Sequence, residues 1–340
     1  MKNLILVTGG AGYIGSHTVV EFQNVGLNSI IVDNLSNSHP TVLSGIKQIT
    51  NVDPIFKLVD VTDKQKLEKV FAEFGHEILG VIHFAALKYV GESVEKPLEY
   101  YGTNINSILN VLSLMRKYKV RNFVFSSSCT VYGQPDTLPV TETSPRKKAV
   151  SPYGNTKAIC EDIIADTVKL GDIKAVILRY FNPIGAHESA LIGENPKQPP
   201  LNIMPIITQT AKGLRPSLSV FGNDYNTSDG TCVRDYIHVV DLAKAHVKAM
   251  QRLSDNKTSE NLEIFNVGTG NGFTVLELIH SFEKVNGIKL NYNITGRRDG
   301  DIEAVWADTT HANNVLGWKA QLSVDDMMRS AWKWELNLNK

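Results

Sequence analysis

Short apolar runs alternate with longer amphipathic segments through the first half of the chain. Segments such as residues 98–118 carry apolar side chains at helical spacing, which predicts helices. Strands and helices in alternation are typical of a doubly wound parallel sheet, so we predict an α/β fold. Six apolar runs have the length of a buried strand, and they lie at residues 4–7, 29–33, 55–59, 79–84, 120–125 and 174–180.

Beyond residue 181 the pattern becomes less regular. Residues 182–202 and 222–235 are rich in Asn, Gly, Pro and Asp, which predicts long loops. We therefore predict a larger domain at residues 1–180 and a smaller α/β domain at residues 181–340, with some segments of the second packing back on the first. Helical spacing returns in three places, at residues 239–253, 275–285 and 324–336.

Residues that favour helix ends support these assignments. Ser151, followed by a proline, has the place of an N-cap before the next helix. Thr274 with Glu277, and Thr62 with Gln65, have the spacing of a capping box. Each of these residues predicts where a helix begins.

The composition bears on whether the protein binds a nucleic acid, a membrane or a metal. The 340 residues carry 35 basic and 35 acidic side chains, so nothing in the charge favours a nucleic acid or a membrane surface. Cys129, Cys160 and Cys232 have neither CxxC nor zinc-ligand spacing, and His238 and His246 are interpreted as structural. No apolar stretch has the length of a signal-peptide core or a membrane span. We expect a cytoplasmic protein that binds no metal, nucleic acid or membrane.

A glycine-rich turn follows the first predicted strand, with glycines at positions 9, 10, 12 and 15. Strand, glycine turn and helix in this order aim free backbone N–H groups at a phosphate, and glycine lets a pyrophosphate approach closely. Asp33 lies 18 positions after Gly15, where a dinucleotide fold places a carboxylate against the adenosine ribose. Such a carboxylate repels a 2′-phosphate, which predicts NAD rather than NADP. The alternative is a turn aspartate before Asn34.

Polar and small residues follow several other strands, at the edge where open α/β sheets bind ligands. Asp60 ends the third strand, where it either reaches the adenine or shapes the turn. Ala85-Ala86 follows the fourth strand and lets a cofactor lie against the backbone, and the serines at 126–128 end the fifth. Asn104, an amide on a long helix, is either a surface residue or a cofactor anchor.

Tyr153 and Lys157 lie four positions apart on a predicted helix, so they share one face. A phenol has a pKa of about 10 in isolation, and a nearby ammonium group and the positive nicotinamide of NAD both favour the phenolate. Tyr153 is therefore a candidate general base near neutral pH. Tyr and Lys also occur at this spacing on solvated helix faces. The glycine turn and the serine cluster upstream favour the catalytic interpretation.

These features together resemble the extended short-chain dehydrogenase/reductase superfamily. The resemblance rests on Gly9-x-x-Gly12-x-x-Gly15, on Tyr153-x-x-x-Lys157 and on the upstream serine. Further strings, along essentially the whole chain, resemble the UDP-glucose 4-epimerase family within it. These strings are Tyr13-Ile14-Gly15-Ser16-His17, Ser126-Ser127-Ser128, Ser151-Pro152-Tyr153-Gly154, Arg179-Tyr180-Phe181-Asn182-Pro183 and Val233-Arg234-Asp235-Tyr236-Ile237-His238.

The resemblance implies an isomerase that interconverts UDP-galactose and UDP-glucose through a transient 4-keto sugar, with NAD bound throughout. Tyr153 would take the proton of the C4 hydroxyl, Ser128 would hydrogen-bond that oxygen, and Lys157 would bind the nicotinamide ribose and lower the tyrosine pKa. The resemblance also implies a Rossmann domain before residue 180 and a UDP-sugar-binding domain after it. A homodimer would form through helices near residues 99–118 and 151–170.

The resemblance also assigns the residues that would contact the ligands. Val305 corresponds to a pocket-wall position where a small side chain leaves room for a 2-acetamido group, so UDP-N-acetylglucosamine and UDP-N-acetylgalactosamine are expected as further substrates. The cofactor contacts would be Gly9, Gly12, Tyr13, Ile14, Gly15, Asp33, Asn34, Asn37, Ser38, Asp60, Val61, Phe84, Ala85, Ala86, Lys88, Asn104, Ser126, Tyr153, Lys157, Tyr180 and Phe181. The substrate contacts would be Lys88, Ser128, Tyr153, Asn182, Asn202, Ser219, Val220, Phe221, Arg234, Arg298, Asp301 and Val305.

Two other functions remain open from the sequence. One is a related NAD-dependent nucleotide-sugar dehydratase or reductase. Dehydratases of the superfamily carry acids where this chain has Cys129 and Thr130, because water elimination needs a further acid/base pair, so this function is disfavoured. The other is a non-catalytic NAD-binding module, which has no need of a base such as Tyr153. Cys129 lacks a paired histidine, so we do not predict a nucleophile there.

Overall fold

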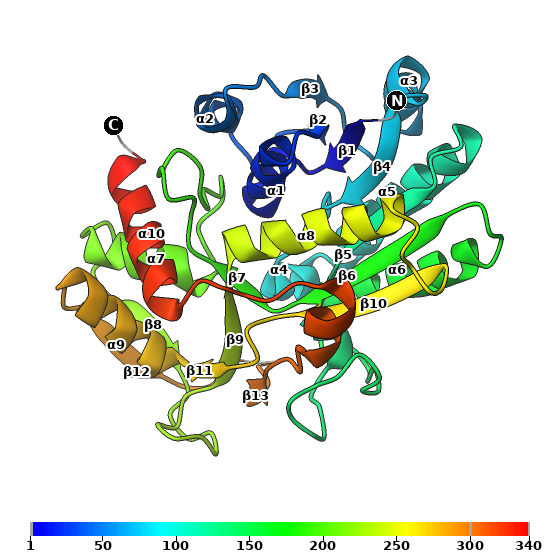
Figure 1. The fold of residues 1–340 in the computed structure, drawn as a ribbon. Coiled ribbons are helices and arrows are strands. Elements are labelled where there is room, and N and C mark those ends of the chain that lie inside the picture. The colour runs from blue at the N-terminus through cyan, green and yellow to red at the C-terminus, as the bar shows by residue number, and fades with distance from the viewer. Residues whose placement is uncertain (1–2, 299–300, 339–340) are drawn as a thin grey trace.

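A seven-stranded parallel sheet lies at the centre of the computed structural model, which describes residues 3–298 and 301–338 (Figure 1). The strand order is β3-β2-β1-β4-β5-β6-β10, so the order changes direction between β1 and β4. This confirms the doubly wound sheet. The strands are β1 (Leu4–Thr8), β2 (Asn28–Asp33), β3 (Ile55–Leu58), β4 (Ile78–His83), β5 (Asn122–Ser128), β6 (Lys174–Tyr180) and β10 (Leu262–Val267).

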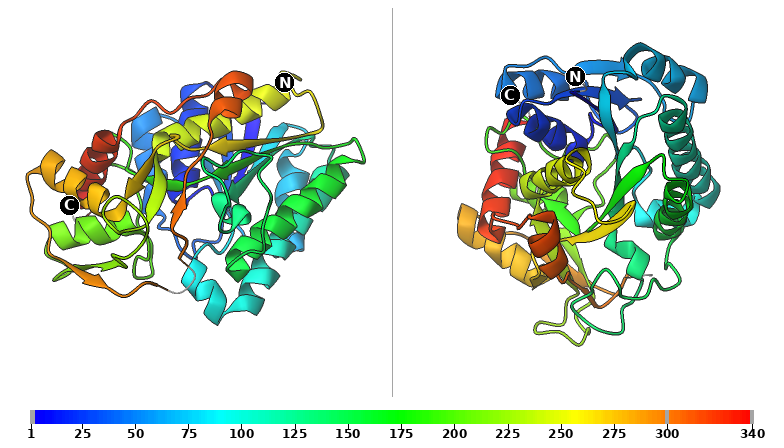
Figure 2. Two further views of the ribbon diagram at one scale, coloured as in Figure 1. Left: turned by 90° about the horizontal axis from the view of Figure 1, so that it is seen from below. Right: turned by 45° about the vertical axis from the view of Figure 1, so that its right-hand side comes forward.

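Helices cover both faces of this sheet (Figure 2). Alternate residues of β1 pack into two different hydrophobic cores, one on each face of the sheet. Ile5 and Val7 pack toward α1 and α8, whereas Leu4 and Leu6 pack toward α3 and α5. Burial on both faces explains why the strands are continuous apolar runs rather than alternating ones. One face carries α1 (Tyr13–Asn24), α2 (Thr41–Thr50) and α8 (Val239–Ser254), and the other carries α3 (Lys64–Phe74), α5 (Pro97–Lys117) and α6 (Pro152–Val168).

The C-terminal half forms two small sheets and three helices with a core of their own. Strand β9 lies between β11 and β13 and also pairs with β7, while β8 pairs with β12. Two segments of this half belong to the larger unit: α8 packs on the large sheet, and β10 is its edge strand beside β6. The elements are β7 (Asn182–Ile184), α7 (Ile203–Ala211), β8 (Leu218–Phe221), β9 (Val233–His238), β11 (Gly272–Thr274), α9 (Val275–Asn286), β12 (Tyr292–Thr295), β13 (Ala304–Val305) and α10 (Val324–Asn337).

Two of the predicted helix starts are confirmed and one is wrong. The Ser151 hydroxyl caps α6, and Thr274 forms a capping box at the start of α9. The predicted box of Thr62 is absent, because α3 begins one residue later with Asp63 as its N-cap. The Thr62 hydroxyl instead donates to Asp60 Oδ1 at 2.6 Å, so it is not free to cap the helix.

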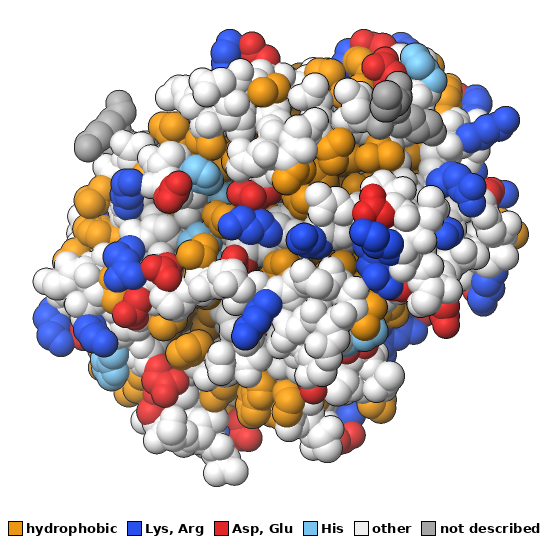
Figure 3. All heavy atoms as spheres, in the orientation of Figure 1, with side chains coloured by type: hydrophobic (Ala, Val, Ile, Leu, Met, Phe, Trp, Pro, Cys, Tyr) orange, Lys and Arg blue, Asp and Glu red, His pale blue; other side chains and the backbone are white. Residues whose placement is uncertain are grey.

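Charged side chains of both signs are scattered over the face shown in Figure 3, as the balanced composition leads one to expect. Within residues 3–298 and 301–338, none of the helices has the length and apolar character that crossing a membrane requires.

Candidate active site

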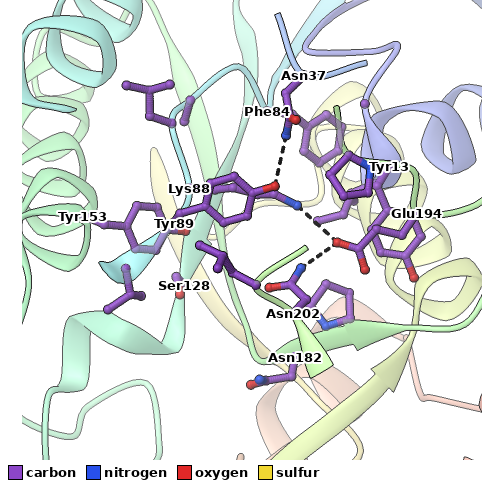
Figure 4. Close-up of a pocket in the computed structure, with 18 of the residues that line it drawn as sticks. Tyr13, Asn37, Phe84, Lys88, Tyr89, Ser128, Tyr153, Asn182, Glu194 and Asn202 are labelled. Atoms are coloured by element: carbon purple, nitrogen blue, oxygen red, sulfur yellow. Dashed lines mark hydrogen bonds and ion pairs between the residues drawn. The ribbon is translucent and has the colours of Figure 1, made fainter. Parts of the chain in front are cut away.

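A cavity of about 1100 Å³ lies where the carboxyl edge of the large sheet faces the C-terminal half. Its walls come from the ends of β1, β2, β4, β5 and β6, from the loop before α7, and from β8, β9 and β13. Figure 4 shows side chains of both halves around one space, with Tyr153 and Ser128 on one side and Glu194 and Asn202 on the other. Open α/β sheets bind ligands at this edge, where the strand order changes direction.

The glycine turn forms one end of the cavity. Gly9 has a φ of +69°, and an added Cβ there would lie 2.8 Å from the backbone nitrogen of Ala85. Gly12, Tyr13 and Gly15 line the cavity at the start of α1. The free N–H groups of this helix start are suited to a pyrophosphate, so this turn fits a dinucleotide.

Replacing Gly15 by alanine is expected to break this turn. Its Cβ would lie 2.3 Å from the Gly9 oxygen and 2.8 Å from the Gly10 Cα, and backbone atoms cannot move aside cheaply. We expect the free energy of unfolding to fall by about 1–3 kcal/mol and the purified protein to lose NAD. Urea unfolding and the NAD released on denaturation measure the two effects. Gly12→Ala is the comparison, because its nearest contact is the Gly9 oxygen at 3.1 Å, and equal losses of stability would contradict the steric explanation.

Asp33 is 8% exposed at the end of β2 and lines the cavity. Its carboxylate accepts hydrogen bonds from the backbone N–H of Ala11 at 3.1 Å, from the N–H of Leu35 at 2.8 Å and from the Ser38 hydroxyl at 3.1 Å. Burial raises its pKa, and these hydrogen bonds oppose that effect. The carboxylate therefore ties the glycine turn to the end of β2, besides being placed to meet a ribose.

Tyr153, Ser128 and Lys157 meet at the opposite end of the cavity. Strand β5 runs three residues further than predicted, to Ser128, and the Ser128 and Tyr153 side chains both line the cavity at this end. Lys157 lies one turn after Tyr153 on α6, and its Nζ donates to the Ser126 carbonyl at 2.7 Å. The Nζ atom is 5.9 Å from the centre of the Tyr153 ring.

The protonation of this group differs from the sequence-based expectation. Burial raises the pKa of Tyr153 well above its ordinary value, and the nearby Ser128 hydroxyl opposes the rise. Burial also lowers the pKa of Lys157 to about 8. In the protein alone, desolvation therefore outweighs the expected stabilisation of the phenolate by Lys157, whose ammonium is directed at the Ser126 carbonyl.

Two arginines and one carboxylate, Arg234, Arg298 and Asp301, lie on a part of the cavity surface that we call the arginine wall. Asp301 Oδ1 accepts from Arg234 Nη2 and from Arg298 Nη2, each at 3.1 Å. The Arg298 guanidinium lies 5.5 Å from the centre of the Phe221 ring. Two guanidinium groups that share one carboxylate keep a net positive charge, which suits a diphosphate.

Nearly all the predicted ligand contacts line this one cavity, and two do not. Asn104 is buried behind the wall, where its Oδ1 accepts from the Leu87 N–H at 2.8 Å and its Nδ2 donates to the Leu87 carbonyl and to the Thr156 hydroxyl. It supports the segment after β4. Val220 is fully buried in the core of the C-terminal half, while its neighbours Ser219 and Phe221 line the cavity.

The sequence analysis missed Glu194 and Tyr89. Glu194 lines the cavity with a side chain that is 8% exposed, and it pairs with Lys88. The Tyr89 hydroxyl accepts a hydrogen bond from Asn37 Nδ2 at 3.4 Å (Figure 4). Glu194 lies in the irregular stretch 182–202, where no periodic pattern marks a buried acid.

The remaining candidate side chains are two histidines and one cysteine. His238 and His246 are buried, and burial lowers the pKa of each to about 4. Burial raises the pKa of the Cys129 thiol to about 12, which leaves it a poor nucleophile. Within residues 3–298 and 301–338, no group of three or more His, Cys, Asp or Glu side chains is placed to hold a metal ion.

Comparisons with known proteins agree on one group. The family described as GDP-mannose 4,6 dehydratase matches residues 6–331. The UDP-glucose 4-epimerase of Haemophilus influenzae is 51% identical over 334 residues, which are 98% of this chain and 97% of that protein. The structure of UDP-glucose 4-epimerase from Bifidobacterium longum in complex with NAD+ and UDP has a TM-score of 0.94 at 47% identity, over 98% of each chain. The enzyme from Stenotrophomonas maltophila, with bound NAD and formylated UDP-arabinopyranose, has a TM-score of 0.94 at 48% identity, over 98% of each chain.

Proposed function

Because the chain belongs to the UDP-glucose 4-epimerases of the extended short-chain dehydrogenase/reductase superfamily, we infer that it interconverts UDP-galactose and UDP-glucose through a 4-keto sugar. It is an NAD-dependent isomerase. The observation that carries this function is that Tyr153, Ser128 and Lys157 lie together on the wall of the cavity that also holds the glycine turn. The positions at which dehydratases carry acids hold Cys129 and Thr130.

One assay tests the function against its alternatives. Purified protein is incubated with UDP-galactose and no added cofactor, and the appearance of UDP-glucose is measured. Conversion under these conditions supports the epimerase. A requirement for stoichiometric added cofactor, oxidised or reduced, indicates a net-redox enzyme such as a reductase, and loss of UDP-galactose with no UDP-glucose formed indicates a dehydratase. Protein that holds NAD and converts nothing would be a non-catalytic module.

The glycine turn and Asp33 would hold the adenosine diphosphate half of NAD, with Asn34, Asn37 and Asp60 around it. The lack of room for a Cβ at Gly9 and Gly15 supports this assignment. When bound, NAD supplies the acceptor and the donor for the hydride at C4 of the sugar.

The chain's own residues supply the proton chemistry. Tyr153 takes the proton of the C4 hydroxyl and returns it, and Ser128 hydrogen-bonds the same oxygen. The Lys157 ammonium would hold the nicotinamide ribose. Its charge, together with that of the positive nicotinamide, would oppose the desolvation that raises the pKa of Tyr153 in the protein alone. No net oxidation results, since each turnover removes and restores one hydride and one proton.

The arginine wall is proposed to hold the nucleotide. The diphosphate would lie on Arg234 and Arg298, and Asp301 accepts from them and can accept from a ribose hydroxyl. A firm grip on UDP leaves the hexose free to turn between the two hydride transfers. Asn182, Asn202, Ser219 and Phe221 complete this wall.

Val305 is proposed to admit a 2-acetamido group. It is 2% exposed on β13, beside Arg234 of β9, and its small apolar side chain lines the cavity. We expect the protein to epimerise UDP-N-acetylglucosamine, measured by formation of UDP-N-acetylgalactosamine. A Val305→Tyr variant is expected to lower kcat/KM for the N-acetylated sugar, relative to that for UDP-galactose, by about 10- to 100-fold. If the parent protein forms no UDP-N-acetylgalactosamine, the proposal that it accepts N-acetylated sugars is refuted.

We also propose a homodimer in the cytoplasm, formed through α5 and α6. Helix α5 exposes Leu98 and Leu109, with 84% and 46% of their surface accessible, and it packs beside α6. Apolar side chains on such a surface favour burial against a second copy. The mass in solution, measured by light scattering, tests the dimer.

A further inference from the structure

We propose that Glu194 is a positioning residue for the UDP-sugar, which acts by fixing Lys88 and Asn202 on the cavity wall. Its Oε1 accepts from Lys88 Nζ at 3.4 Å and from Asn202 Nδ2 at 2.6 Å (Figure 4). Lys88 follows β4 and Asn202 precedes α7, so one carboxylate joins the two halves of the chain. This role rests on the proposed function. It assigns to Glu194 an effect on UDP-sugar binding that is exerted through Lys88 and Asn202.

Glu194 is held from behind by the C-terminal helix. Trp334 Nε1, on α10, donates to the Glu194 carbonyl at 3.0 Å. The indole packs on Gly193, where an added Cβ would lie 2.5 Å from the ring. Helix α10 therefore fixes the backbone from which the Glu194 side chain extends toward Lys88 and Asn202.

The contact with Glu194 determines which way the Asn202 amide points. Asn202 is the N-cap of α7, yet its side chain makes no capping hydrogen bond, although asparagine is a favoured capping residue. A carboxylate only accepts hydrogen bonds, so it selects the amide Nδ2 and turns Oδ1 away. Asn202 lines the cavity, and this orientation presents an acceptor to a ribose hydroxyl or a uracil N–H.

The contact with Lys88 distributes the charge in the cavity. Lys88 is neutralised by its own carboxylate, Glu194, whereas Arg234 and Arg298 share the single carboxylate of Asp301. The net positive charge therefore lies on the arginine wall. A diphosphate is directed there, and the nucleotide takes one orientation across from Tyr153.

Glu194→Gln tests the proposal, because glutamine keeps the shape, removes the charge and allows the Asn202 amide to flip. We expect the KM for UDP-galactose and the Kd for UDP, measured by calorimetry, to rise about tenfold, as for loss of a hydrogen bond to a charged group. We expect kcat, NAD content and the midpoint of urea unfolding to stay near those of the parent. Glu188→Gln is the matched control, since Glu188 is exposed in the same loop and does not line the cavity.

Further variants test whether Glu194 affects UDP binding through Lys88 and Asn202 or by another route. In a chain that carries Lys88→Met and Asn202→Ala, Glu194→Gln is expected to change the Kd for UDP by less than about twofold. Trp334→Phe, which loses the indole donor, is expected to raise the same constants by a smaller factor and replaces the test if Glu194→Gln does not fold. An unchanged KM and Kd in Glu194→Gln, or a full effect in the double-variant background, would overturn the proposal. A parent that does not convert UDP-galactose refutes the proposed function, while binding of UDP still tests Glu194.

Discussion

A Tyr153→Phe variant is expected to turn over UDP-galactose about 10² to 10⁴ times more slowly than the parent, because it lacks the only proposed proton acceptor. Phenylalanine keeps the ring that α6 presents to the cavity and removes only the hydroxyl. The fold and the bound NAD should therefore persist. Initial rates at saturating UDP-galactose, together with the NAD content, measure the effect.

Tyr132→Phe provides the matched control. The Tyr132 hydroxyl donates to Asn266 Oδ1 at 2.6 Å and accepts from Arg179 at 3.1 Å, and the residue does not line the cavity. Its loss should lower the free energy of unfolding by about 0.5–1.5 kcal/mol and leave turnover close to that of the parent. Turnover that is unchanged in Tyr153→Phe, or lost equally in both variants, would remove Tyr153 from its assigned role.

The central sheet was predictable because both of its faces are buried. A strand with a core on each side needs apolar residues at every position, and Leu4 to Val7 meet that need without reference to other parts of the chain. Helix caps can also be predicted from nearby residues. The prediction failed at Thr62, because its hydroxyl donates to Asp60 and does not cap the helix. The pairing of β10 with β6 joins Leu262 to Ala175, and no local pattern encodes a partner so far along the chain.

The site was predictable where it lies at strand ends. Asp33, Asp60 and Ser128 lie at or just after the carboxyl ends of parallel strands that meet at one edge, so their place on a common ligand-binding edge could be predicted before the structure was known. Glu194 has no such marker, because it reaches the cavity from an irregular loop held by a helix about 140 residues later. Asn104 was predicted to be either a surface residue or a cofactor anchor, whereas it is buried behind the cavity wall, where it holds the backbone of Leu87.

Acid is expected to unfold this protein more steeply than its carboxylates alone would explain. Burial lowers the pKa of His17 and His83 to about 3 and that of His238 and His246 to about 4, whereas an exposed histidine has a pKa of about 6.5. The unfolded chain therefore binds nearly four more protons than the folded chain near pH 5, and unfolding is favoured as the pH falls from about 6.5 toward 4. Each proton contributes about 1.4 kcal/mol per pH unit, so the four together lower the free energy of unfolding by about 5 kcal/mol per unit.

Such a slope removes most of the stability of an ordinary domain, about 5–15 kcal/mol, within two or three pH units. Urea unfolding at pH 7.5, 6.5 and 5.5, at a fixed NAD concentration, measures this slope.

A His246→Phe variant tests whether the buried histidines cause the slope, because His246 packs between Phe84 and Tyr180 and its Nε2 has no hydrogen-bond partner among the described residues. The phenyl ring can occupy the same apolar site and takes up no proton on unfolding, so the slope should fall by about 1.4 kcal/mol per pH unit. A slope equal to that of the parent would show that His246 already titrates normally in the folded chain, and the buried histidines would no longer account for the acid sensitivity.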